Sequence, residues 1–417
     1  MNAEHPLDAR AGQLALAPAD ERPSLAASLQ EECRAGGVYP ASLQSAYHAL
    51  GRGELPPMTV PAFNVRGLTY ELSRAIWRTA LDLKAGPFIL ELAPSEASAC
   101  RQTFEEYAGL VLAAAVREGH RGPVFLQGDH FQVDSPQALA EVLELARRVV
   151  QAGFYQLDID ASHLFDAASH DLVGFHAPNA RATARMVADL RGCQPPAVRL
   201  TLGGEVGEIG GRNTSVADLL AFHQEYARLL PAGVSGLDKL SAQTGTTHGG
   251  VVQPDGKVGR MPIDLGLAAD LSRQARAVGL AGLVQHGAST LPVSDLARLP
   301  GAGVIEVHLA THIQNLVFDH PAFPTALLDQ MRERLVMPAG GAEGESGGDA
   351  GEMNAAQRFY RARWAAWGLF KPELLGLPEA ALRPIKQSVG AWVAEVFGAL
   401  RIEGGAERFR AFARSEA

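Results

Sequence analysis

VFLQGDHFQ, residues 124–132, is an apolar run that ends in Gly-Asp-His. A short apolar run bounded by turn residues is typical of a strand covered on both faces. Gly128 ends this strand, which places Asp129 and His130 just past its carboxyl end. Parallel α/β sheets keep their ligand sites at that end of their strands. The stretch therefore favours a parallel α/β fold with a polar site, although an Asp-His pair alone also suits an ordinary polar turn.

The same alternation continues along the chain. From about Met58 onward, short β-rich apolar runs alternate with longer segments of helical periodicity, such as residues 68–84. Eight strands, each followed by a segment of helical length, favour a closed (β/α)8 barrel, or TIM barrel, over an open sheet. The predicted strands are residues 58–63, 87–93, 123–129, 154–160, 197–204, 235–242, 281–287 and 303–310.

Segments outside this alternation predict three additions to the barrel. Residues 1–40 are Ala-rich and weakly helical, and we expect an N-terminal extension packed on or near the rim. The barrel domain is predicted at residues 41–337. Residues 338–354 are rich in Gly, Glu and Ser, which predicts a flexible linker. Residues 355–417 contain amphipathic stretches and predict a C-terminal helical appendage.

Composition excludes several classes of protein. The chain has 417 residues, 47% of them hydrophobic, which is enough apolar material for a large core. Its net charge is −9 without a block of Lys and Arg, so neither nucleic acid nor an anionic membrane is an expected partner. No apolar run reaches the ~18 residues of a membrane span, and the N-terminus lacks a signal peptide's apolar core. The three cysteines form no CxxC pair, which favours a cytoplasmic location.

Polar residues stand at the ends of the other predicted strands too. Since the carboxyl ends of all barrel strands lie at one rim, we expect these side chains to converge. Histidines scattered at random would not be expected to choose strand ends this often. The residues are Asp129, His130, Asp158, Asp160, His163, Glu205, Glu208, His248, His286, Ser289, His308, Thr311 and His312.

Three histidines on separate strands form a natural ligand set for a catalytic divalent cation. Imidazole suits borderline-soft ions such as Zn²⁺, and three protein ligands leave coordination positions open for substrate. We assign His130, His248 and His286 to this set. Ordinary hydrogen bonding is the alternative, and it explains less well why each stands at a strand end.

Glycine follows two of these histidines, as Gly249 and Gly287. A residue without a side chain lets backbone N–H groups approach an anion closely. We therefore expect a phosphate at the amides around Gly249, Gly287 and Ser289. The Gly-rich residues 202–211 lack both the GxGxxG spacing and the Lys of a P-loop, which excludes a nucleotide loop.

Six motifs between Pro61 and Thr311 resemble, in order, those of the class II, metal-dependent fructose-bisphosphate aldolase family, which includes tagatose-bisphosphate aldolases. Each motif alone is a weak signal, but six in the correct order are a strong one. The family's fold is a (β/α)8 barrel, in agreement with the alternation. The motifs are PAFNV (61–65), GDH (128–130), IDASHL (159–164), EVGEIGG (205–211), LDKLSAQTGTTHGG (237–250) and HGAS (286–289).

The resemblance implies reversible cleavage of a ketose bisphosphate, fructose 1,6- or tagatose 1,6-bisphosphate, to dihydroxyacetone phosphate and an aldehyde through a metal-stabilised enediolate. The implied reaction belongs to carbohydrate metabolism, as a step of glycolysis. His130, His248 and His286 would hold Zn²⁺ or another divalent ion, and a monovalent cation is a further cofactor to consider. Asp160 and Glu205 would lie close to the metal or form an alternative position for it.

The resemblance also implies roles around the substrate. Asp129 would exchange the proton on the hydroxyl at the bond that breaks, as general acid–base. Gly249, Gly287 and Ser289 would bind the phosphate of the dihydroxyacetone phosphate half, with Asn64 near the substrate. Family members are commonly dimers or tetramers, so a homo-oligomer is expected.

Two departures from the family pattern concern the substrate. The family's acidic pair after the fifth strand is replaced at residues 212–214, so Glu208 is the nearest carboxylate for the second proton transfer. At the eighth strand, His308 and Ala310 replace an Asn and an Asp that grip the substrate. We assign His308 and Thr311 to substrate binding. An aldolase for another phosphorylated sugar and a non-catalytic sugar-phosphate-binding barrel therefore remain as alternatives.

Three other residues have competing interpretations. Lys239 lies within a predicted strand and would suit a Schiff-base aldolase, but histidines of metal-ligand type on the same rim favour the metal route. His163 more often stabilises its own turn than takes a direct role. For His312, and likewise for His308, capping and packing are favoured over binding an anion or a second metal.

Overall fold

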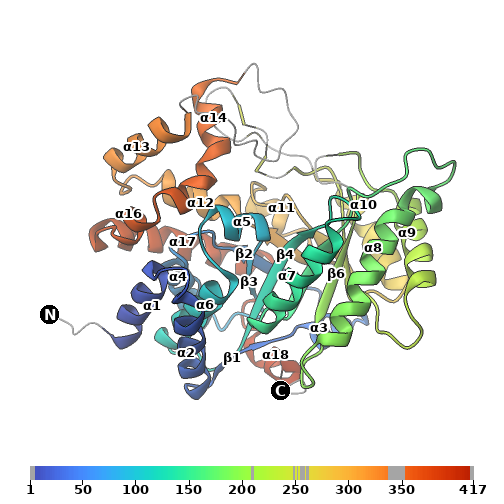
Figure 1. Ribbon diagram of the computed structural model, residues 1–417, viewed down its shortest axis with the longest axis horizontal. Helices are drawn as coiled ribbons and strands as arrows, with labels where there is room; N and C mark the ends of the chain where they lie inside the picture. The colour runs from blue at the N-terminus through green and yellow to red at the C-terminus, as the bar shows by residue number, and fades with distance from the viewer. Residues whose placement is uncertain are drawn as a thin grey trace.

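The computed structural model describes residues 5–207, 211–247, 249–250, 252–253, 259, 263–336 and 353–413. Within this part of the chain, eight parallel strands close into a barrel, since β2 pairs with both β3 and β9 (Figure 1). The TIM barrel is confirmed, and each strand falls on a predicted stretch. The strands are β2 Val60–Asn64, β3 Ile89–Leu92, β4 Gly122–Gln132, β5 Gln156–Asp160, β6 Thr201–Val206, β7 Lys239–Ala242, β8 Leu283–Gln285 and β9 Val304–Leu309.

Helices cover the outside of the barrel and bury one face each. In α4, Leu72, Ile76 and Ala80 stand four residues apart and are at most 3% exposed, because side chains at this spacing share one face of a helix. This face packs on the core, so periodicity alone predicted the helix. The helices that follow the first seven barrel strands are α4 Thr69–Asp82, α5 Pro94–Ala99, α6 Phe104–Arg117, α7 Leu139–Gln151, α8 Leu172–Cys193, α9 Val216–Leu229, α10 Leu265–Ala277 and α11 Val293–Leu296.

Helix α17, Glu379–Ala399, covers the barrel beside β2 although it is far from β9 in sequence. It packs against α4, α11 and α12. Its Trp392 and Phe397 each lie edge-on to Phe63 of β2, with ring centroids 5.9 Å apart. It therefore completes the helical layer where the helix after the eighth strand is expected. The other helices after β9 are α12 Thr311–Phe318, α13 Thr325–Val336, α14 Ala355–Ala362, α15 Ala366–Leu369, α16 Lys371–Leu375 and α18 Ala406–Ala413.

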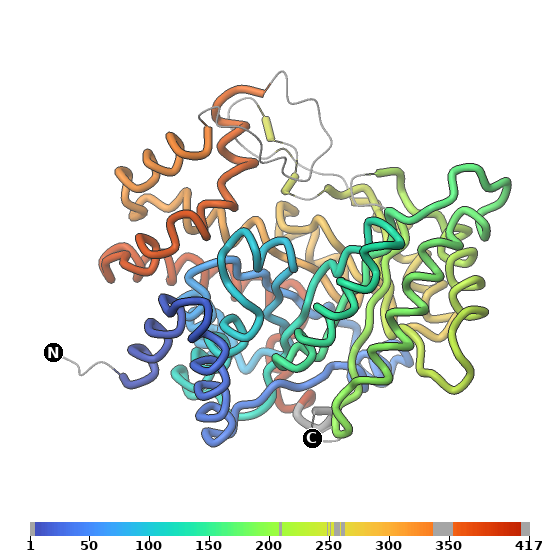
Figure 2. The backbone as a smooth tube through the Cα atoms, in the orientation of Figure 1, coloured from blue at the N-terminus to red at the C-terminus, as the bar shows by residue number. Residues whose placement is uncertain are grey.

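The N-terminal elements are α1 Pro6–Leu16, α2 Arg22–Ala35, β1 Val38–Ala41 and α3 Gln44–Gly51. Helices α1 and α2 pack on α6, on the same side of the barrel as the C-terminal helices (Figure 2). Strand β1, which the sequence did not predict, pairs with the amino end of β4. The extension thus lies on the outer wall of the barrel: β1 lies at the amino ends of the strands, while Arg22 at the start of α2 contacts Glu106 near the start of α6.

The predicted division into domains stays a prediction. The linker expected at residues 338–354 lies outside the described residues except for its last two positions. No helix in the described ranges is long and apolar enough to cross a membrane.

Candidate metal centre

The sequence placed Asp129 and His130 just past a strand that ends at Gly128, but β4 continues to Gln132 and carries both residues at a break in its pairing with β5. Gly128 lies opposite Leu157 while Phe131 lies opposite Ile159, so β4 holds one extra residue here. His130 has a φ of 45°, a left-handed conformation that costs a non-glycine residue about 1 kcal/mol or more. Bulges of this kind re-aim side chains next to active sites. The strain thus coincides with a predicted metal ligand.

Four side chains at the carboxyl ends of the strands form a cluster that we call the rim group: Asp129, His130, Glu205 and His286. Each offers one ligand atom, and these atoms all lie within 4.8 Å of one another. His130 Nε2 lies 2.9 Å from His286 Nδ1, and His130 Nδ1 lies 3.0 Å from Glu205 Oε1. The fold therefore brings two predicted metal histidines together with a predicted carboxylate.

Asp160 orients this cluster from one side. Its Oδ2 lies 3.4 Å from His130 Nδ1. Its Oδ1 accepts hydrogen bonds from the backbone N–H and the hydroxyl of Ser162, at 3.0 and 2.7 Å. A carboxylate held by its own hydrogen bonds fixes the orientation of the imidazole that it contacts. Asp160 thus lies next to the predicted ligand His130, and its place near a metal stays a prediction.

Burial and charge set the protonation of the rim group. Burial, reinforced by Asp160, raises the pKa of Glu205 to about 7. Burial acts in the same direction on Asp129, but the charges of His130 and His308 hold the pKa of Asp129 well below its usual value. Burial would lower the pKa of His130, and its carboxylate neighbours Asp129 and Glu205 instead hold it well above its usual value. Asp129 is therefore ionised beside imidazoles that carry protons.

The rim group suits a divalent cation. Two imidazoles with carboxylates are a donor set for borderline ions such as Zn²⁺. Asp129 Oδ1 and Glu205 Oε1 are buried and accept no hydrogen bond of ordinary geometry from the described residues. Buried carboxylate oxygens are costly without a partner, and a cation would supply one.

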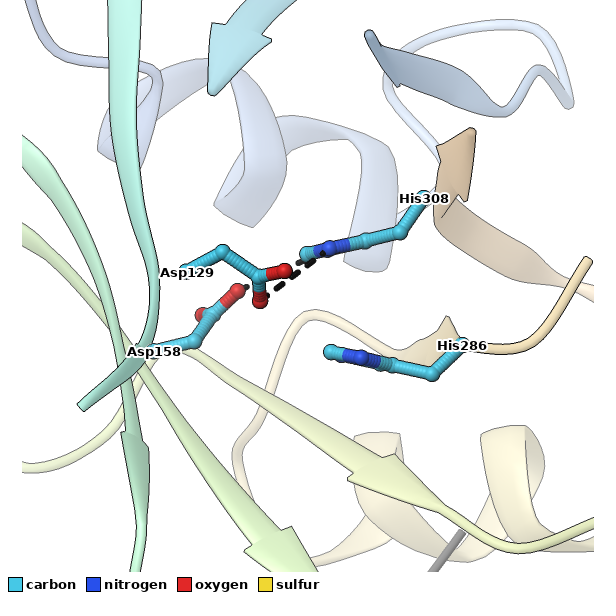
Figure 3. A group of neighbouring side chains, drawn as sticks. All are labelled: Asp129, Asp158, His286 and His308. Carbon is cyan, nitrogen blue, oxygen red and sulfur yellow. Dashed lines mark ion pairs between the residues drawn. The ribbon is translucent and has the colours of Figure 1, made fainter. Parts of the chain in front are cut away.

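A second cluster, the inner group, consists of Asp129, Asp158, His286 and His308 (Figure 3). All four are at most 6% exposed. His308 Nδ1 lies 3.3 Å from Asp129 Oδ1, and the rings of His286 and His308 stack with centroids 4.0 Å apart. His308, which the sequence assigned to substrate, thus lies inside the barrel against the predicted proton carrier.

Three buried polar residues next to the inner group, Gln127, Lys239 and Glu306, were not predicted as part of the site. Lys239 Nζ lies 3.0 Å from Asp158 Oδ1, pairs with Glu306, and donates to Gln127 Oε1 at 2.8 Å. Burial would lower the pKa of Lys239, but Asp158 and Glu306 raise it above its usual value. Because a charged ammonium is not nucleophilic, this environment does not favour the Schiff-base alternative.

The sequence held a signal for these residues. Side chains two apart along a strand share one face, so a polar residue two positions before a site residue also faces the barrel interior. The unpredicted residues with this spacing are Gln127, two positions before Asp129, and Glu306, two positions before His308.

The predicted substrate residues have local partners. Asn64 Nδ2 donates to Glu96 Oε2 at 2.5 Å. Ser289 Oγ accepts from the backbone N–H of Ala310 at 2.7 Å, which links the loop after β8 to the end of β9. Thr311 is buried and begins α12. These contacts hold three strand ends at one rim.

The two predicted phosphate glycines have positive φ angles, 66° at Gly287 and 71° at Gly249. A Cβ at Gly287 would stand 2.8 Å from the Thr246 hydroxyl, so this close approach of two loops requires glycine. Gly249 is held from outside the barrel, since its carbonyl accepts a hydrogen bond from Tyr360 of α14 at 3.3 Å.

Two predicted site residues, Glu208 and His248, lie outside the described residues. His163 Nδ1 lies 2.9 Å from Gln132 Nε2 and 3.1 Å from Asp134 Oδ1, so these partners stand at the end of β4 and just after it instead of in the turn of His163 itself. His312 stacks on the tryptophan of α17 with ring centroids 4.6 Å apart, in agreement with packing.

Comparison with known proteins gives a family and a fold. A sequence model of the family described as fructose-bisphosphate aldolase class-II matches residues 51–345. Fructose-bisphosphate aldolase from Campylobacter jejuni is 18% identical with a TM-score of 0.54, over 88% of this chain and 97% of that one. A "probable tagatose 6 phosphate kinase" from Sinorhizobium meliloti 1021 is 18% identical with a TM-score of 0.55, over 84% and 100%.

The fructuronate-tagaturonate epimerase UxaE from Cohnella laeviribosi is also similar in structure. It is 11% identical with a TM-score of 0.57, over 84% of this chain and 82% of that one. At these identities the three structures establish the shared fold, and the sequence model carries the family.

Proposed function

The chain belongs to the class II fructose-bisphosphate aldolase family, and from this premise we propose that it is a zinc-dependent aldolase. Its substrate would be fructose 1,6- or tagatose 1,6-bisphosphate, cleaved to dihydroxyacetone phosphate and an aldehyde. The convergence of His130, His286 and Glu205 beside an ionised Asp129 carries this proposal. His248 would complete the ligand set, and Asp160 would orient His130.

Two different carboxylates would carry out the two proton transfers of the reaction. When bound, the cation would polarise the ketose carbonyl and stabilise the negative charge that develops during cleavage. Asp129 removes the proton from the hydroxyl at the bond that breaks, for which its low pKa keeps it ionised. The electron pair of the broken bond stays on the dihydroxyacetone phosphate half. Glu208 is the group that we assign to return a proton to that carbon.

The substrate is gripped by residues of several strand ends. Gly249, Gly287 and Ser289 would bind the phosphate of the dihydroxyacetone phosphate half. The positive φ angles of the two glycines support this, because such turns can direct backbone amides at an anion. Asn64 and Thr311 would contact the sugar. His308 would act at the substrate through Asp129, which lies 3.3 Å from its Nδ1.

One observation favours an aldolase for another phosphorylated sugar. The eighth strand ends in His308 and Ala310, and His308 is enclosed by Glu91 and Glu306 instead of facing outward. A substrate with a different group at this position would fit that change. A sugar-phosphate-binding barrel without turnover is the remaining alternative. In all three cases we expect a cytoplasmic homo-oligomer, a dimer or tetramer, on the strength of the family resemblance.

A coupled assay of triose phosphate release separates these functions. The full-length protein would be given fructose 1,6-bisphosphate, tagatose 1,6-bisphosphate and ketose monophosphates, before and after treatment with a chelator. Cleavage of a bisphosphate that stops with chelator and returns with Zn²⁺ is the expected result. Turnover of other phosphorylated ketoses alone would assign the related aldolase. If the protein binds zinc and phosphate but turns over none of these substrates, the proposal of an enzyme is wrong, and the sugar-phosphate-binding barrel without turnover is supported.

A further inference from the structure

The inner group shares Asp129 and His286 with the rim group but adds Asp158 and His308, which the rim group does not use. Figure 3 shows the four side chains pointing toward one another from different strands. Their ligand atoms lie within 4.8 Å of one another, which is the spacing of groups that can share one ion. The barrel therefore offers two overlapping sets of ligands.

The ring of His308 places its Nδ1 inside this group. Nδ1 lies 3.0 Å from Glu91 Oε2 and 3.3 Å from Asp129 Oδ1, while Nε2 lies 2.8 Å from Glu306 Oε1. Neither Nδ1 nor Asp129 Oδ1 has a hydrogen-bond partner of ordinary geometry among the described residues, and His308 and Asp129 are both over nine-tenths buried. A buried ring nitrogen that faces carboxylate oxygens without such a hydrogen bond has the geometry of ligands around one cation.

The charges around the group point the same way. Lys239 is the one fixed cation that the described residues place in ion-pair contact with these carboxylates. Six buried carboxylates around this one ammonium make the interior of the barrel acidic, which favours the binding of cations. Buried carboxylates must be neutralised by a cation or a proton. The six buried carboxylates are those of Glu91, Asp129, Asp158, Asp160, Glu205 and Glu306.

We propose that the inner group is a second divalent-cation site, with Asp158 and His308 as its own ligands and Asp129 and His286 shared with the rim group. Two imidazoles with two carboxylates suit Zn²⁺, Mn²⁺ or a similar borderline ion. Nothing in the family motifs supplies this site, because His308 stands where the family has an Asn.

The effect of the second ion rests on the proposed aldolase function, in which the first ion is held by His130, His248, His286 and Glu205 and Asp129 stays free to accept a proton. The second ion would bind Asp129 itself. A carboxylate that binds a cation no longer accepts a proton from substrate. Filling the inner group therefore inhibits turnover, so activity rises with the first equivalent of metal and falls with the second.

The test is the metal stoichiometry of the full-length protein, which needs no assay of turnover. Metal-free protein would be titrated with Zn²⁺ and, separately, Mn²⁺, and the bound ions counted by equilibrium dialysis and elemental analysis. Two ions per chain are expected for the natural sequence, and one for Asp158→Asn and for His308→Asn. Thermal unfolding of each variant shows that it is folded.

A matched control is His48→Asn. His48 Nε2 lies 2.8 Å from the buried Asp238 at the amino end of β7, so the control removes the same kind of His–Asp pair at the opposite end of the barrel. It should still bind two ions. A natural protein that saturates at one ion per chain would overturn the proposal, and a proton on His308 would then supply the charge. Two ions in both folded inner-group variants would overturn it equally. Two bound ions together with no turnover at one equivalent of metal would count against the aldolase alone.

Discussion

His130 Nε2 and His286 Nδ1 lie 2.9 Å apart, although 156 positions separate the two residues in sequence. Since both nitrogens would face one cation, His130→Ala and His286→Ala should each weaken Zn²⁺ binding by at least ~100-fold, more than the loss of an outer contact. Competition with a chromophoric chelator measures this affinity. His48→Ala, at the other end of the barrel, is the control. Natural affinity in either site variant would remove that histidine from the ligand set.

Metal affinity should rise with pH between about 6 and 8. In the metal-free protein burial raises the pKa of Glu205 to about 7, so below that pH a proton occupies the carboxylate that must bind the ion. The raised pKa of His130 adds a second competing proton. Each proton lost on binding changes the affinity about tenfold per pH unit while its group is protonated. Zn²⁺ titrations at three pH values measure the slope, which Glu205→Gln should make shallower. A flat profile would contradict the assignment.

Asp129→Asn should lower kcat by at least ~100-fold, the usual scale for losing an acid–base group. The side chain keeps its shape, and the ion at His130 and His286 should remain bound. Steady-state rates and elemental analysis of the same sample separate the two effects. Full turnover in this variant would show that another group moves the proton.

Tyr360→Phe should weaken phosphate binding about 2–10-fold, the value of one hydrogen bond. The Tyr360 hydroxyl donates to the Gly249 carbonyl and accepts from Asn315 Nδ2 at 3.2 Å, so it ties the predicted phosphate loop to α12. Calorimetry with inorganic phosphate measures the loss. Tyr70→Phe is the matched control, because its hydroxyl donates to Asp8 on α1. Equal phosphate affinity in both variants would exclude this tie.

Phe397→Ala should lower the free energy of unfolding by about 3–5 kcal/mol, as is typical when a buried aromatic ring is removed. Phe397 is fully buried, with Phe63 of β2 and Phe88 beside its ring. Urea unfolding measures the change. Leu16→Ala, at a residue 58% exposed, should stay within about 0.5 kcal/mol. A small effect at Phe397 would mean that α17 does not close the helical layer.

Most of the fold could be predicted from the sequence because each barrel strand is a short apolar run between turn residues. Strand β1 could not be predicted, since it has only four residues and includes Pro40. It pairs with the first residues of β4, outside the barrel. The place of α17 was not predictable either. Several helices separate it from β9, and only packing against Phe63 decides where it lies.

The rim group could be predicted from the sequence because the carboxyl ends of all barrel strands meet at one rim. His130, His286 and Glu205 stand at three of these ends. The network around Lys239 was only partly predictable. Glu306 stands two positions before His308 and so shares its face of the strand, but its pairing with Lys239 joins strands far apart in sequence.

The position of a bound ion tests the central claim most directly. Crystals of the full-length protein grown with Zn²⁺ would be measured at the zinc absorption edge, and the anomalous difference map would locate the metal. The predicted result is a peak about 2.1 Å from ring nitrogens of both His130 and His286. The absence of a peak there, or zinc bound only at other residues, would contradict the metal centre and the aldol chemistry built on it.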